Sequence, residues 1–191
     1  MSDTGGADDG QVTEPTLDPE TLREVYPDPA AARARIVALR TEIREAPDEI
    51  AELIARADLV VLLRGVGELD EALNEANAAV DRAELAGTPA QQHTARVRLA
   101  HVHQWRGEFA ESNMLFTELL PAAPRFGPVI DAFTHQHAGK NDYDQGHWAD
   151  ARDHFARALA LSEELELPAN EIDSSRTALA AARRHLQEDG T

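Results

Sequence analysis

The chain has 191 residues, of which 42% are apolar and only 5% aromatic, so its core must be built mainly from Ala and Leu. The net charge of -17 disfavours nucleic acid and anionic membranes as partners, because phosphate binding draws its affinity from Lys and Arg. The absence of cysteine excludes a disulfide framework, and the lack of an export signal or an 18-residue apolar run favours the cytoplasm.

The N-terminal part of the chain is rich in Gly, Asp, Thr and Pro and shows hardly any apolar periodicity. We therefore expect residues 1–27 to form a disordered acidic tail. Asp28 followed by Pro29 is typical of an N-cap with proline at the first helical position, which predicts a capping helix over 28–46. A short disordered tail is expected at 188–191.

Helical apolar spacing, interrupted by Gly and Pro, predicts paired helices after the capping helix. The pairs are expected over 48–87, 90–121 and 128–166. A single amphipathic helix over 169–187 would cover the exposed face of the last pair, as solenoids require for solubility. Residues 28–187 would then form one helical array.

A six-residue pattern that opens with glycine occurs three times, at Gly67, Gly107 and Gly146. Intervals of about 40 residues fit a helix-turn-helix unit repeated along a solenoid, because such a unit cannot bury its apolar face alone. Stacked helix pairs build a long binding surface more readily than a catalytic site, so the repeat indicates a binding function.

These copies resemble the tetratricopeptide repeat (TPR) family, in the long-repeat form of bacterial regulators. The excess of Arg over the single Lys is similar to the composition of proteins from GC-rich bacteria of the actinobacterial type. The resemblance implies an all-α fold, a right-handed α-solenoid of antiparallel helix pairs with N- and C-terminal capping helices. The positions that carry the repeat signature are Gly67, Ala72, Gly107, Phe109, Phe116, Gly139, Gly146, Trp148, Ala151 and Phe155.

The resemblance also implies a concave groove, lined by the first helix of each pair, that holds peptides. The corresponding positions are Ile54, Ala57, Val61, Arg64, Thr94, Val97, His101, Gln104, Trp105, Phe133, Gln136, Lys140, Tyr143 and Asp144. Their aromatic and cationic side chains suit a protein or peptide partner with an acidic group or a C-terminal carboxylate. Two alternatives stay open: Arg64, His101 and Lys140 are solvated helix-face residues, and Trp105 packs between repeats.

Nothing in the sequence indicates a catalytic site or a metal site. His101 and His103, like His135 and His137, are two residues apart, so each pair would point to opposite faces of a helix and could not chelate a metal. A pH-sensitive surface is the milder interpretation of these histidines. Because no catalytic or phosphate-binding motif occurs, we expect no catalytic residue, metal or cofactor, and the chain is not expected to be an enzyme.

The leading hypothesis is therefore a cytoplasmic adaptor or regulatory module that binds a protein or peptide segment in its groove. The alternative is an acidic stoichiometric inhibitor, of the immunity type, that covers a basic partner with its outer surface. Two further possibilities are left open by the sequence. The acidic tail would lie across the protein's own groove until a partner displaces it, or the solenoid would form a homodimer through one end.

Overall fold

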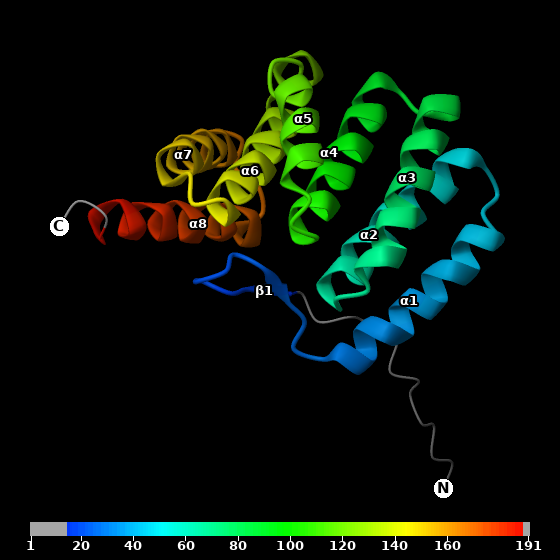
Figure 1. Ribbon diagram of the computed structural model, residues 1–191. Coiled ribbons are helices and arrows are strands. Elements are labelled where there is room, and N and C mark those ends of the chain that lie inside the picture. Colours follow the sequence, from blue (N-terminus) through cyan, green and yellow to red (C-terminus); the bar gives the residue numbers. More distant parts are fainter. Residues whose placement is uncertain (1–14, 189–191) are drawn as a thin grey trace, which may run out of the picture.

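The computed structural model describes residues 15–188, and this part of the chain is almost entirely helical (Figure 1). The all-α class expected from the sequence is confirmed. Strands β1 (Thr16–Leu17) and β2 (Glu24–Val25) pair in an antiparallel hairpin. The helices are α1 (Pro29–Arg44), α2 (Glu49–Gly65), α3 (Leu69–Ala86), α4 (Pro89–Trp105), α5 (Phe109–Leu119), α6 (Pro128–Asp144), α7 (Trp148–Glu164) and α8 (Ala169–Glu188), with a 3-10 turn η1 (Ala123–Phe126) between α5 and α6.

The helices begin where capping side chains satisfy the free amides of the first turn. The Asp28 carboxylate accepts hydrogen bonds from two amides of α1 at 2.9 and 3.0 Å, which confirms the N-cap expected there. Asp48 caps α2 in the same way. Thr88 and Gln91 form a reciprocal capping box at the start of α4. Local sequence therefore sets these helix starts.

The three repeated glycines end α2, α4 and α6 with the same turn. Gly67, Gly107 and Gly146 have φ angles of 84°, 74° and 76°, a conformation that glycine adopts without a steric penalty. In each turn the residue after the glycine donates its N–H to the carbonyl five residues earlier, at 2.9 to 3.0 Å. This pattern satisfies the last carbonyls of the helix and reverses the chain.

Consecutive helices pack against each other along the chain, and α2 also contacts α4, α4 contacts α6, and α6 contacts α8. These four helices therefore form a row, which we call the α2–α4–α6–α8 row. The helices follow one another across the molecule in chain order, and the hairpin lies beside the row (Figure 1). Among residues 15–188, no helix is both long and apolar enough to span a membrane.

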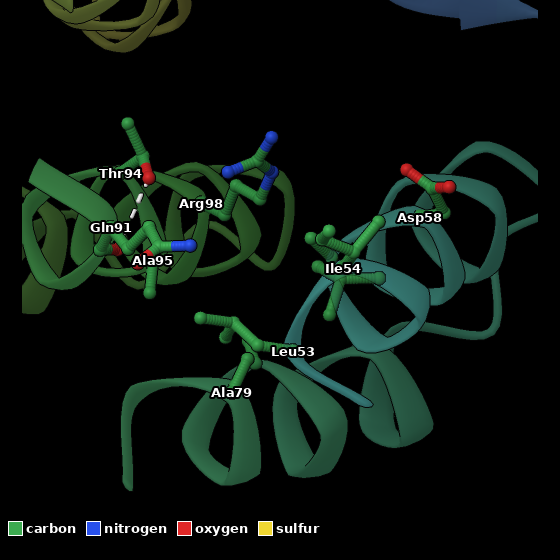
Figure 2. A pocket seen from close by; sticks show the side chains of 11 residues that line it. Leu53, Ile54, Asp58, Ala79, Gln91, Thr94, Ala95 and Arg98 are labelled. Atoms are coloured by element: carbon green, nitrogen blue, oxygen red, sulfur yellow. Dashed lines mark hydrogen bonds between the residues drawn. The ribbon is translucent and has the colours of Figure 1, made fainter. Parts of the chain in front are cut away.

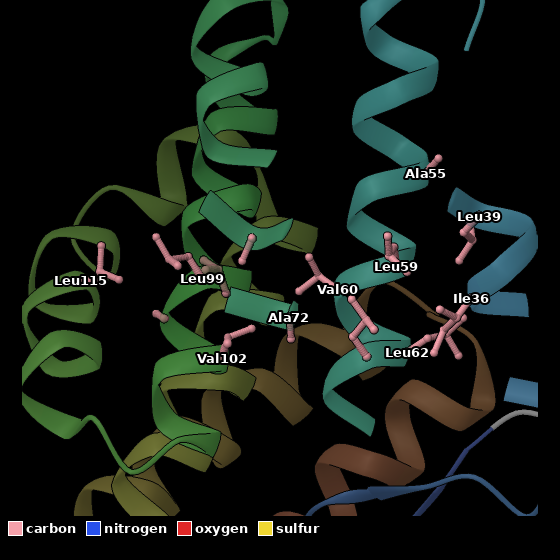
Figure 3. Packing of buried hydrophobic residues seen from close by; sticks show 14 of the residues in the cluster. Ile36, Leu39, Ala55, Leu59, Val60, Leu62, Ala72, Leu99, Val102 and Leu115 are labelled. Carbon is pink, nitrogen blue, oxygen red and sulfur yellow. The ribbon is translucent and has the colours of Figure 1, made fainter. Parts of the chain in front are cut away.

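Small residues and a few bulky ones fill the core, as the composition requires. The larger cluster joins helices from α1 to α6 and includes Phe116. Figure 3 shows other members of it, among them Leu59, Val60 and Ala72. A second cluster joins α6, α7 and α8 around Phe155, which is fully buried. Of the other repeat-signature residues, Ala151 is buried, Phe109 and Trp148 are half-buried, and Gly139 lies against Phe155.

The N-terminal segment differs from the expected disordered tail. Residues 15–27 are ordered, because the hairpin makes hydrogen bonds, ion pairs and apolar contacts with helices far along the chain. Those contacts are formed only in the folded molecule, so local composition did not indicate them. The expected tails at 1–14 and 189–191 lie outside the described residues.

Candidate functional site

The hairpin segment, residues 15–27, lies on one face of the α2–α4–α6–α8 row, and we call this surface the hairpin-binding face. At the centre, the Glu24 carboxylate accepts a hydrogen bond from Lys140 Nζ at 2.6 Å and another from Arg64 Nη2 at 3.0 Å. The side chains of Arg64 and Lys140 are only 3% and 5% exposed. Cations from two helices therefore converge on one carboxylate.

The charge of Glu24 is held in place by these two cations. Burial of its carboxylate would raise its pKa, but the positive charges of Arg64 and Lys140 and the hydrogen bond from Lys140 hold the pKa well below its usual range. A buried ion pair has to offset the cost of desolvating its charges, and it does so only with close geometry and matched partners. Here each carboxylate oxygen has its own cation.

Two neutral histidines lie beside this ion cluster. His101 and His137 have ring centroids 4.2 Å apart. Burial lowers the pKa of each histidine well below its usual value, and the nearby charges of Arg64 and Lys140 lower it further. Arg64 Nη1 lies 2.8 Å from His101 Nδ1, and Trp105 Nε1 lies 3.2 Å from His101 Nε2. Because a neutral imidazole has one acceptor nitrogen, only one of these donors can be satisfied.

A second polar group extends the hairpin-binding face towards the end of α6. Arg23 forms an ion pair with Asp144 at 3.3 Å, and Gln104 Nε2 donates to the same carboxylate at 2.7 Å. The Arg23 guanidinium also lies 4.8 Å from the centroid of the Trp105 ring. Tyr143 Oη lies 2.9 Å from the backbone carbonyl of Glu20, to which it donates. The face thus binds both side chains and backbone of an extended segment.

Apolar side chains anchor the hairpin at both ends. Leu22 is buried in the cluster that includes Tyr143 and residues of α7 and α8. Tyr26 is buried in the larger cluster against α1 and α2. A Cβ atom at Gly65 would lie 2.2 Å from Tyr26 Cε2, so only glycine leaves room for this ring. The hairpin segment therefore joins the two hydrophobic clusters across the row.

An open cleft lies further along α2 and α4, where the hairpin does not reach. Its volume is about 200 Å³, and its lining comes from α2, α3 and α4 (Figure 2). Leu53 and Ala79 form part of its wall, Ile54 is 57% exposed, and Arg98 contributes a cation. The cleft can accept an apolar side chain next to a charged group.

The structure brings half of the expected groove residues together around the hairpin segment. Those that surround the hairpin segment are Arg64, His101, Gln104, Trp105, Lys140, Tyr143 and Asp144. The interpretation of Arg64, His101 and Lys140 as solvated residues is wrong, because all three are buried. Ile54, Ala57 and Thr94 line the open cleft.

The remaining expected groove residues have other contacts. Val97 is fully buried in the larger hydrophobic cluster, so its assignment to the groove is wrong: its side chain faces the core. Gln136 contacts α8 through Ser174 and Ser175. The Phe133 ring lies 4.4 Å from that of His137, and Val61 is half-buried.

Residues of the hairpin were missed as candidates. Glu24, Leu22 and Tyr26 fall within the expected disordered tail. The sequence over residues 22–26 does not alternate apolar and polar residues, because Glu24 is charged and the apolar Val25 is exposed, so it gave no strand signal. His137 was considered only together with His135, whereas its partner is His101 from the neighbouring helix.

Histidines also meet on the opposite side of α6. His135 Nδ1 lies 2.8 Å from His154 Nδ1, and His135 Nε2 lies 3.6 Å from Asp131. Within residues 15–188, no group of three or more His, Cys, Asp or Glu residues is arranged to hold a metal ion. As the sequence predicts, His101 and His103 point apart: His101 lies under the hairpin and His103 contacts Glu108.

The described chain is therefore an all-helical protein that seats an extended segment on a face with buried cations. No protein-family model matches the sequence, and no curated protein matches it. Among solved structures, the fold is similar to the crystal structure of BtubC (BKLC) from P. vanneervenii, with a TM-score of 0.58 and 16% sequence identity. The match covers 84% of this chain and 75% of that one, and at this identity it shows the fold alone.

Proposed function

We propose that this chain is a non-enzymatic protein- or peptide-binding adaptor or regulatory module of the cytoplasm. Its helix pairs would form a right-handed TPR-like solenoid, and the hairpin-binding face would be the concave groove of that array. The partner is a protein segment that presents an acidic group, either a side chain or a C-terminal carboxylate.

The pairing of Glu24 with Arg64 and Lys140 is the observation that carries this proposal. These cations come from α2 and α6, and they converge on one carboxylate of an extended segment. Charge-assisted hydrogen bonds of this kind are roughly twice as strong as neutral ones. Helix faces that bind backbone and carboxylate groups together are suited to peptides.

A peptide-display selection on the full chain tests the proposal. We expect the enriched peptides to share an acidic residue, because an occupant that covers Arg64 and Lys140 without an anion would leave two buried cations uncompensated. A variant with Arg64→Glu and Lys140→Glu should lose these peptides. Recovery of the same peptides by this variant would sink the proposal.

Arg176→Glu is the matched control for charge reversal. Arg176 lies on α8, is 56% exposed at its side chain and pairs with Glu163 and Asp173, away from the hairpin. This variant should keep the enriched peptides. Enrichment of basic peptides that is abolished by salt would instead support the inhibitor alternative, in which the acidic outer surface covers a basic partner.

A further inference from the structure

We infer that the hairpin segment, residues 15–27, is a built-in occupant of the partner site, and that an extended peptide segment of defined pattern displaces it. The pattern is an acidic residue separated by four or five residues from an apolar one. This inference rests on the proposed function and adds the regulation of the site and the chemistry of the partner.

The site can hold one acidic segment at a time. Glu24 takes both cations: Lys140 binds Oε1 and Arg64 binds Oε2. Leu22 and Tyr26 fill the apolar positions on either side. A partner carboxylate can reach the same cations only after Glu24 leaves. Binding of the hairpin and of the partner must therefore be mutually exclusive.

The hairpin segment is an incomplete ligand for this face. Arg64 Nε, Gln104 Oε1 and His137 Nδ1 are buried and have no hydrogen-bond partner among the described residues. His101 faces two donors and can accept from only one of them. A buried polar group without a hydrogen-bond partner costs free energy. The docked hairpin therefore does not make all the hydrogen bonds that this face offers. A peptide that supplies an acceptor for Arg64 and a donor for Gln104 would bind this face better.

The open cleft gives a partner an advantage over the hairpin. None of its lining residues belongs to the hairpin segment. A tethered segment competes at an effective concentration of the order of millimolar, so a free partner needs additional contacts to displace it. An apolar side chain placed against Ile54 and Leu53 would supply such a contact, because Ile54 is 57% exposed.

The helix geometry sets the spacing of the pattern. Ile54 and Arg64 are ten residues apart on α2, which corresponds to about 15 Å along the helix axis. An extended chain advances about 3.3 Å per residue, so about four or five residues span that distance. An acidic residue at the cations and an apolar residue in the cleft are therefore separated by this interval.

A peptide added in trans tests whether the hairpin is displaceable. The probe is a fluorescent 13-residue peptide with the sequence of residues 15–27, PTLDPETLREVYP. In the full chain, Glu24→Lys places a third cation against Arg64 and Lys140 and should release the tethered hairpin. We expect the probe to bind this variant at least about tenfold more tightly than the wild-type chain by fluorescence anisotropy. Equal binding to both chains would overturn the inference.

Two further variants guard against an unfolded Glu24→Lys chain and a nonspecific signal. Leu22→Asp removes a different anchor of the hairpin, so it should expose the site by an independent route. Gly65→Ala, added to Glu24→Lys, blocks the position of Tyr26 and should abolish probe binding. A probe with Gln in place of Glu24 should bind at least about tenfold more weakly. If it binds equally well, the carboxylate is not the recognised group and the inference fails.

The displayed peptides distinguish failure of this inference from failure of the proposed function. They should bind Glu24→Lys more tightly than wild type, and Ile54→Arg should weaken them while leaving the 13-residue probe unaffected. Displayed peptides that bind wild type and Glu24→Lys equally would refute displacement and leave the proposed function standing. If the selection yields no peptide although the probe binds Glu24→Lys, the hairpin contact is only structural and both proposals fail.

Discussion

At the scale of the residue, the close approach of α6 and α7 depends on one position that has no side chain. Gly139 lies inside α6, where glycine is intrinsically unfavourable. A Cβ atom there would lie 2.6 Å from Phe155 Cε1 and 2.7 Å from its Cδ1. The Phe155 ring is fully buried and has little room to move. Packing against α7 therefore outweighs helix propensity at this position.

We expect Gly139→Ala to lower the free energy of unfolding by about 1–3 kcal/mol, because overpacking a well-filled core forces side chains and backbone to shift. Urea denaturation followed by circular dichroism measures this change. Adding Phe155→Leu should recover part of the loss by removing the ring that the new methyl group meets. An unchanged or increased stability of Gly139→Ala would show that the ring gives way.

The resemblance to a repeat singled out several residues that the structure brings together, but it did not indicate their surroundings. Arg64, His101 and Lys140 were found because each lies on the corresponding face of its own helix, α2, α4 or α6. The structure brings the three side chains together. Their burial could not be predicted, because it depends on Glu24, which is 116 residues from Lys140 in sequence. Val97 was misplaced since the same periodicity cannot separate the side of a helix that faces its neighbours from the open side.

At the scale of the element, α2, α4, α6 and α7 end in the same turn, and one of these four turns lacks glycine. Three turns place glycine in the left-handed region, whereas the turn after α7 places Glu166 there, with a φ of 51°. Leu167 donates its N–H to the Ser162 carbonyl at 3.0 Å, as in the other three turns. The backbone therefore adopts the same turn with a residue that is strained in it.

Glu166→Gly should raise the free energy of unfolding by about 0.5–1 kcal/mol, because relief of the strain exceeds the extra entropy that glycine gives the unfolded chain. Gly146→Ala, at the equivalent position after α6, should lower it by a similar amount. Thermal and urea unfolding of both variants measure the pair of effects. Destabilisation by Glu166→Gly would contradict the strain that its φ angle implies.

Helices were predictable from the sequence because their signals are local. Asp28, Asp48 and Thr88 cap helix starts, and the apolar residues recur at helical spacing. The hairpin was not predictable in the same way. Its strands are two residues long, so they leave almost no periodicity, and its order comes from contacts with α2, α6 and α8. Tertiary contacts decided the state of this segment.

At the scale of the whole molecule, the net charge is negative but cations are buried beneath the hairpin. The chain carries a net charge of -17, yet its only lysine is buried under the hairpin together with Arg64. Two neutral histidines, His101 and His137, lie beside these cations. Any proton added to them would meet the positive charges of Arg64 and Lys140, together with Arg23 at His101 and Arg98 at His137, while the negative charge of Glu24 favours a proton on His137. Protonation of His101 and His137 is therefore unfavourable in the folded state.

This arrangement gives stability a defined dependence on pH. The pKa of His101 and His137 is lowered in the folded state, so only well above pH 6.5 does neither state bind a proton at these histidines, and there they contribute nothing to pH dependence. Below pH 6.5 the unfolded chain takes up protons that the folded chain does not, and the free energy of unfolding falls. The lowered pKa of Glu24 adds a further loss below about pH 4.5, where the unfolded carboxyl becomes protonated.

We expect the free energy of unfolding to fall as pH decreases from 6.5 to 5, by up to about 1.4 kcal/mol per pH unit for each buried histidine. Urea denaturation at several pH values measures the slope. His137→Gln should reduce the slope, because it removes one of the histidines whose pKa is lowered by burial; His93 and His135, whose pKa burial also lowers, should leave part of the slope in this variant. A free energy of unfolding that stays constant between pH 6.5 and 5, or a slope that His137→Gln leaves unchanged, would contradict the lowered pKa of the histidines beneath the hairpin.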